Sequence, residues 1–176
     1  MLRLSELEDQ WTNALAEAEQ QARAQGRQDI AEYVALRSSN DRLRRTAIDW
    51  LLTTFSEQAA DSNRAGASLQ IDHFDDHRFG IGQATMAGRL LTLTFGARAL
   101  HVEAGWPRTP RDGFIRGGGF ACANIRHPGR PQLNDELLLV QNAGRAPQWA
   151  ILKKNGQRGV LTKDRIAHHL TELLKT

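Results

Sequence analysis

The amino-acid sequence predicts an α+β fold in a single domain. Apolar residues recur at spacings of three and four over residues 1–60, at a spacing of two over about 66–160, and at helical spacing again over 162–175. Helices, then a run of strands, then a helix are typical of an antiparallel sheet with segregated helices. We therefore expect N-terminal helices, a central antiparallel sheet of about five to seven strands, and a C-terminal helix packed on the sheet.

The first 60 residues are expected to form helices with one apolar stripe each. The first stripe lies on an acidic helix that Gly26 should end. A short helical piece follows around Ile30, and Ser38-Ser39-Asn40-Asp41 supplies N-cap residues for a second helix over roughly 41–59. Trp11 and Trp50 lie on these stripes and are expected in the core. The first stripe consists of Leu4, Leu7, Trp11 and Leu15.

The alternation of apolar and polar residues predicts a series of strands, of which one hairpin is the best defined. A two-residue turn at Gly96-Ala97 would place Leu93 opposite Leu100 and Leu91 opposite Val102, so that the apolar side chains share one face. Thr162 is the expected N-cap of the final helix. Further strands are predicted at 68–74, 78–85, 113–125, 136–141 and 147–153.

Composition restricts the class of protein. A chain of 176 residues, 40% hydrophobic and 24% charged, can bury a core of its own. A single cysteine, Cys122, excludes a disulfide framework and is typical of a reducing compartment. The N-terminus shows no secretory signal, and no run approaches the roughly 18 apolar residues of a membrane span. We expect a cytoplasmic protein with no membrane partner.

The positive charge is concentrated in the middle of the chain. Residues 1–60 carry a net charge of −3, whereas residues 106–158 carry nine basic and three acidic side chains, a net charge of +6. Pro107 and Pro110 should hold an exposed loop extended, and Gly117-Gly118-Gly119 inside a strand pattern indicates a close approach of the backbone. A second loop rich in proline and glycine follows at 126–131.

These two loops predict a surface that binds anions, since guanidinium groups bind phosphate and carboxylate through paired N–H donors. The proposed partner is nucleic acid or a small phosphate or carboxylate ligand, bound without catalysis. Alternatively, the arginines are ordinary solvated surface, and the glycines make room for a side chain or a partner subunit. No phosphate-loop or dinucleotide motif is present, so no cofactor is expected. The predicted contacts are Arg108, Arg111, Arg116, Arg126 and Arg130.

Two histidine motifs each allow a functional and a plainer interpretation. His73, Asp75 and His77 would share one face of an extended chain, as metal ligands do, but Asp-Asp between two strands is also ordinary turn chemistry, and no metal is predicted. His101 and Glu103 could form an acid–base pair, but the solvent face of a half-buried strand is the favoured interpretation.

Two alternatives to the anion-binding function remain open at this stage. The N-terminal amphipathic helices could pair with a second copy to form a homodimer. A small-molecule enzyme could use His101 with Glu103, or His73 with Asp75. No nucleophile motif supports the enzyme, and Cys122 between two alanines is expected to be a buried, inert thiol.

Overall fold

The computed structural model describes residues 4–176 and confirms the α+β fold. Its strands pair in chain order, each antiparallel to the next, so the sheet is a seven-stranded meander. The helices are α1 (Leu4–Ala24), α2 (Gln28–Arg64) and α3 (Lys163–Leu174). The strands are β1 (Gln70–Ile81), β2 (Ala84–Phe95), β3 (Arg98–Trp106), β4 (Cys122–Arg126), β5 (Asp135–Val140), β6 (Gln148–Leu152) and β7 (Arg158–Val160).

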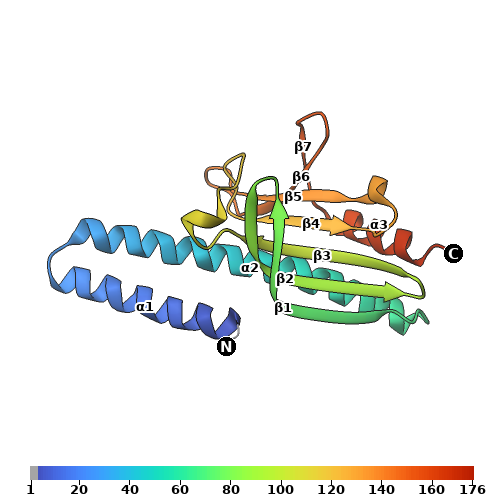
Figure 1. Cartoon of the computed structure of the whole chain (residues 1–176), viewed down its shortest axis with the longest axis horizontal. Helices are drawn as coiled ribbons and strands as arrows, with labels where there is room; N and C mark the ends of the chain where they lie inside the picture. Colours follow the sequence, from blue (N-terminus) through green and yellow to red (C-terminus); the bar gives the residue numbers. More distant parts are fainter. Residues whose placement is uncertain (1–3) are drawn as a thin grey trace.

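The first two helices form a hairpin that projects beyond one end of the sheet (Figure 1). Gly26 lies in the left-handed region with φ of +70°, and its N–H donates to Arg23 O at 3.1 Å, which confirms the predicted end of α1. Leu15 is buried, whereas Leu7 and Trp11 stay almost half exposed, so the prediction of a core Trp11 is wrong. The two helices bury Leu15, Ala22, Ala31 and Val34.

Helix α2 runs without a break for 37 residues. The predicted interruption at Ser38–Asp41 is therefore wrong. An N-cap preference amounts to only about 1 kcal/mol, whereas the inward face of α2 continues from Val34 through Asp41 to Ile48, all of them buried. Packing along the whole of this face outweighs the local signal for a helix start.

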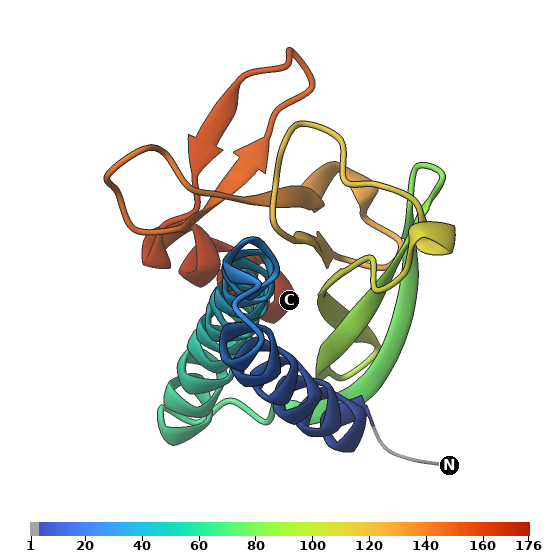
Figure 2. The same ribbon diagram turned by 90° about the vertical axis from the view of Figure 1, so that its left-hand side faces the viewer.

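Helices α2 and α3 cover one face of the sheet, and the strands curve around them (Figure 2). The main core lies in this interface, and Thr162 caps α3 as predicted by accepting a hydrogen bond from Arg165 N at 3.2 Å. The predicted core residue Trp50, however, is 41% exposed. The largest side chains of this core include Leu51, Phe55, Leu91, Leu93, Leu100, Ile125, Leu139, Ile166 and Leu173.

The β2–β3 hairpin has the predicted register, with Leu93 opposite Leu100 and Leu91 opposite Val102. The preceding hairpin differs from the prediction. The strand expected at 78–85 contains the turn itself, because Gly82, with φ of +58°, ends β1 and Gln83 leads into β2. Residues 75–77, expected in a turn between two strands, belong to β1, which has a β-bulge between Phe74 and His77.

The glycine-rich segment before β4 is a loop rather than the predicted strand at 113–125. A Cβ placed on Gly119 would lie 2.1 Å from Cδ1 of Leu138, so the backbone there rests directly on a side chain of β5. The structure thus agrees with the interpretation in which glycine makes room for a side chain. Two short 3-10 turns, Pro110–Asp112 and Pro131–Leu133, lie in the loops that flank β4.

Candidate anion-binding site

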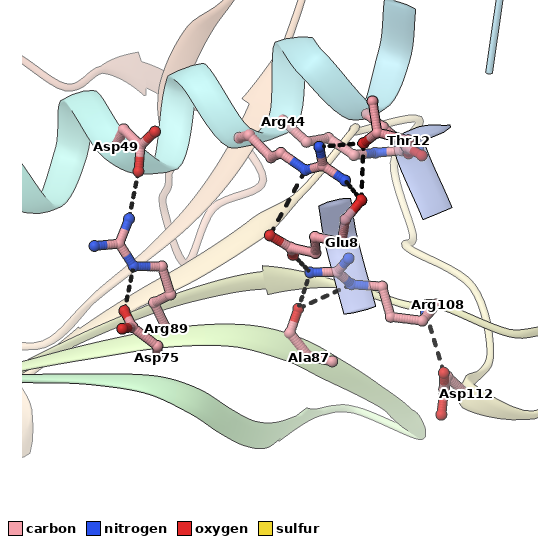
Figure 3. A network of polar contacts seen from close by, with 11 residues as sticks. Glu8, Thr12, Arg44, Asp49, Asp75, Ala87, Arg89, Arg108 and Asp112 are labelled. Carbon is pink, nitrogen blue, oxygen red and sulfur yellow. Dashed lines mark hydrogen bonds and ion pairs between the residues drawn. The ribbon is translucent and has the colours of Figure 1, made fainter. Parts of the chain in front are cut away.

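The five predicted arginines lie in different surroundings, and Arg108 is turned inward. Its guanidinium donates to a carboxylate oxygen of Glu8 at 2.6 Å and to Ala87 O at 3.3 Å (Figure 3). It also stacks over the ring of Trp106, with the guanidinium carbon 3.4 Å from the ring centroid. Arg108 therefore joins α1 to the sheet, through an ion pair between residues 100 positions apart that sequence spacing does not reveal.

The other four arginines are more accessible, but they do not share one pocket. Arg111 and Arg116 are exposed in the loop before β4, and neither forms a hydrogen bond or ion pair with another described residue. Arg130 donates to Glu172 O, near the end of α3, at 3.0 Å. Arg126, at the end of β4, lies beside other ionisable side chains.

Arg126 lines a pocket on the sheet face that points away from α2 and α3. The register places His101, Glu103 and Arg126 on this face, because Leu100, Val102 and Ile125 between them point into the helix-covered core. The loop between β4 and β5 forms one wall. The pocket is lined by His77, Leu90, His101, Glu103, Arg126, His127, Pro128, Gly129, Pro131 and Asn134.

Glu103 is the centre of this site, with a side chain only 3% exposed. One carboxylate oxygen lies 2.6 Å from Nε2 of His77, and the other accepts from Asn124 at 3.0 Å and pairs with Arg126. Burying a carboxylate is costly unless its oxygens are bonded. Here both oxygens have partners, and these hold His77 and Arg126 at the pocket with side chains 24% and 48% exposed.

Two imidazoles of the pocket, those of His77 and His101, have lowered pKa values. Burial lowers the pKa of His77, and the positive charge of Arg126 lowers it further. The same two causes, with His77 as a third, lower the pKa of His101. A neutral His77 that donates its Nε2–H to Glu103 keeps Nδ1 as a hydrogen-bond acceptor.

Glu103 contacts a histidine, but not the one that lies beside it on the same strand. Glu103 bonds His77 of β1, whereas His101, two residues away on the same strand, forms no hydrogen bond to it within the described structure. The sequence signal for His77 was its alternation with Phe79, whose ring it stacks on at 5.7 Å. Its contact with Glu103 depends on the order in which β1, β2 and β3 pair, and the sequence does not predict that order.

The residues weighed as a metal site diverge. His73 lies 3.2 Å from the hydroxyl of Ser56 on α2, and Asp75 accepts from Arg89 at 3.2 Å (Figure 3). His77 points to Glu103 instead. Across residues 4–176, no group of three histidine, cysteine or acidic side chains is arranged to hold a metal ion.

A second polar cluster lies on the other face of the sheet, beneath α3. Asp135 accepts two hydrogen bonds from Arg165, at 2.8 and 2.9 Å, and lies 2.8 Å from Nε2 of His169. Nδ1 of His169 lies 2.9 Å from Nε2 of His127, and both imidazoles are 1% exposed. His169 therefore packs α3 against the sheet.

Cys122 is buried, as predicted. It lies on the sheet face that points away from α2 and α3, here called the open face. Burial and the nearby Glu136 raise the pKa of its thiol to about 12, so the sulfur is protonated at neutral pH. It packs with Phe79, Met86 and Leu138 in a small apolar cluster. The thiol is therefore a packing group.

Comparison of this chain with protein-family models, with curated proteins and with solved structures gives no match. Within residues 4–176, no helix combines the length and apolarity needed to cross a lipid bilayer.

Proposed function

We propose that this protein binds a small anionic ligand, of the phosphate or carboxylate class, in the pocket formed by His77, His101 and Arg126. The observation that carries the proposal is the buried carboxylate of Glu103, which bonds two groups that remain open to the pocket. A strand that only covers a core would place an apolar or solvated residue at this position. We infer that Glu103 is present here because its carboxylate orients His77 and Arg126.

The arrangement suits an oxyanion of modest charge. Arg126 offers N–H donors that Glu103 does not use, and the imidazoles of His77 and His101 lie in the same pocket. Because Glu103 neutralises the charge of Arg126, the site carries little net charge at pH 7. Protonation of His77 and His101 below their lowered pKa values adds positive charge, so anion affinity should rise as the pH falls.

Sulfate is a suitable probe, because its charge does not change across this pH range. We expect NMR titration of the full chain to show shifts at His77 and His101, with Kd in the millimolar range at about pH 7 and several-fold tighter binding once the pH is low enough to protonate these imidazoles. Arg126→Ala should abolish the shifts. Arg111→Ala, which removes an exposed arginine outside the pocket, is the matched control.

Two outcomes would contradict the proposal. Equal loss of sulfate binding in both arginine variants would indicate only a general effect of positive charge. Salt-sensitive binding of a labelled oligonucleotide that depends on Arg111 and Arg116, without sulfate binding at Arg126, would move the function to the loop before β4 and to nucleic acid.

Acid–base chemistry on the bound anion is a second candidate, favoured by the 2.6 Å contact between His77 and Glu103. The carboxylate orients the imidazole and leaves Nδ1 to accept a proton from a ligand, while Arg126 stabilises negative charge. The described lining of the pocket contains no serine, cysteine or lysine nucleophile, so this candidate is limited to proton transfer. A His77→Gln variant that still binds sulfate through Arg126 but loses turnover of a ligand would support it.

We also propose a cytoplasmic location, because the lone thiol of Cys122 needs no oxidising compartment. A homodimer through α1 remains a further proposal, supported by the partial exposure of Leu7 and Trp11. Light scattering of the Leu7→Ser and Trp11→Ser variants against the unmodified chain tests it, and an unchanged monomeric mass throughout would reject it.

A further inference from the structure

A second pocket lies on the opposite side of the sheet from Arg126, where α2 meets β5 and β6. It has a volume of about 580 Å³ and a mostly apolar lining. That size is within the range of small-molecule sites. The pocket is lined by Ser39, Arg42, Leu43, Thr46, Ala47, Trp50, Leu139, Pro147, Gln148, Trp149 and Leu161.

Two tryptophans give this pocket its character. Trp149 is buried, and its indole N–H donates to Ala47 O on α2 at 3.0 Å, which fixes the ring and the spacing between helix and sheet. Trp50, one turn further along α2, is 41% exposed although its neighbours Leu51 and Leu52 are fully buried. A core residue at this position would be covered. The exposed ring of Trp50 beside an apolar pocket therefore indicates a surface that a ligand can contact.

The charge at the rim restricts what can occupy the pocket. Arg42 is exposed and forms no ion pair or hydrogen bond with another described residue. The nearest acidic groups on α2 are committed elsewhere, since Asp41 pairs with Arg44 and Asp49 pairs with Arg89. One positive charge therefore remains beside an apolar cavity, together with the polar side chains of Ser39 and Gln148.

We propose that this pocket binds a hydrophobic carboxylate, with a flat aromatic or short aliphatic body between Trp50 and Trp149 and its carboxylate at Arg42. Apolar burial supplies the affinity of such a ligand. The guanidinium sets its orientation. This site shares no residue with the anion pocket on the open face, so each proposal can be tested without the other.

The probe is 2-naphthoate, followed by quenching of tryptophan fluorescence and by calorimetry on the full chain. We expect saturable binding with a Kd below about 1 mM. Arg42→Gln should weaken naphthoate binding roughly twofold to fivefold and leave binding of the uncharged 2-naphthalenemethanol unchanged. Arg111→Gln, which removes an exposed arginine outside the pocket, should change neither.

A second variant tests the location without removing any core contact. Thr46 lines the pocket and is exposed, so Thr46→Trp should fill the space and abolish binding of both probes while circular dichroism shows an intact fold. No saturable naphthoate binding, or binding that Thr46→Trp leaves unchanged, would overturn the proposal. A dimer that Thr46→Trp dissociates, with no naphthoate binding, would assign the pocket to a second copy of the chain instead.

Discussion

Two buried carboxylates, one on each face of the sheet, bond the same kinds of partner in different surroundings. Glu103 and Asp135 each bond one histidine and one arginine. Around Asp135, His169 is 1% exposed and lies between α3 and the strands. Around Glu103, the histidine and the arginine both open into a pocket. The comparison shows that the surroundings of an acid–histidine–arginine cluster decide whether its partners are buried beneath a helix or open into a pocket.

The largest expected effect comes from breaking the buried cluster. Asp135→Asn leaves His169 and Arg165 without their carboxylate, and loss of one partner of a buried pair costs about 3 kcal/mol or more in the free energy of unfolding. Urea denaturation measures this loss. Glu136→Gln, an exposed neighbour on the same strand, is the control and should stay within about 0.5 kcal/mol.

The second largest expected effect is the destabilisation of the same cluster by acid. Burial, with His169 and Arg130 nearby, lowers the pKa of His127 to about 4 from the 6.5 of an unperturbed imidazole. Between these values the unfolded chain binds the additional proton, so the free energy of unfolding falls by about 3 kcal/mol as the pH drops from 6.5 to 4. His127→Gln should flatten this part of the pH profile, and an unchanged slope would show that another group controls it.

Asp135 extends the loss of stability to lower pH. Burial alone would raise the pKa of this carboxyl, but the hydrogen bonds from His169 and Arg165 outweigh it and lower the pKa to about 2. The stabilisation is therefore complete above its unfolded value of 3.8 and disappears as the pH falls towards 2. In Asp135→Asn, this second phase of acid unfolding should be absent.

The open cluster should respond more weakly to the matching substitution. Glu103→Gln keeps the hydrogen bond with Asn124 and leaves His77 and Arg126 free to be hydrated in the pocket, so we expect a loss of only about 1 kcal/mol in the free energy of unfolding. The same urea experiment gives the comparison. If Glu103→Gln destabilised the fold as much as Asp135→Asn, the distinction between the two clusters would be lost.

The smallest effect is a shift in titration without unfolding. Arg126 lowers the pKa of both His77 and His101 through its positive charge. Arg126→Ala should therefore raise both pKa values toward that of an unperturbed imidazole, which proton NMR of the ring resonances detects. His127, which is buried and whose imidazole contacts His169 beneath α3, is the internal control, since Arg126 does not contribute to its shift.

Part of the candidate site could be inferred from sequence. Alternation placed His101 and Glu103 on one face of a strand, and the charge count singled out the segment containing Arg126. His77 was weighed only as a metal ligand, because its contact with Glu103 spans 26 positions and depends on the pairing of three strands. Arg108 shows the reverse case, in which an arginine expected in a solvated loop is bound by Glu8.

The sequence by itself determined the elements whose cause is local. The register of the β2–β3 hairpin follows from turn chemistry and alternation. The end of α1 follows from Gly26, and the start of α3 follows from Thr162. Only the tertiary structure decided the continuity of α2 and the partners of the two carboxylates. The physical reason is that packing and ion pairs between distant segments outweigh local preferences of about 1 kcal/mol, and these contacts exist only once the strands are assembled.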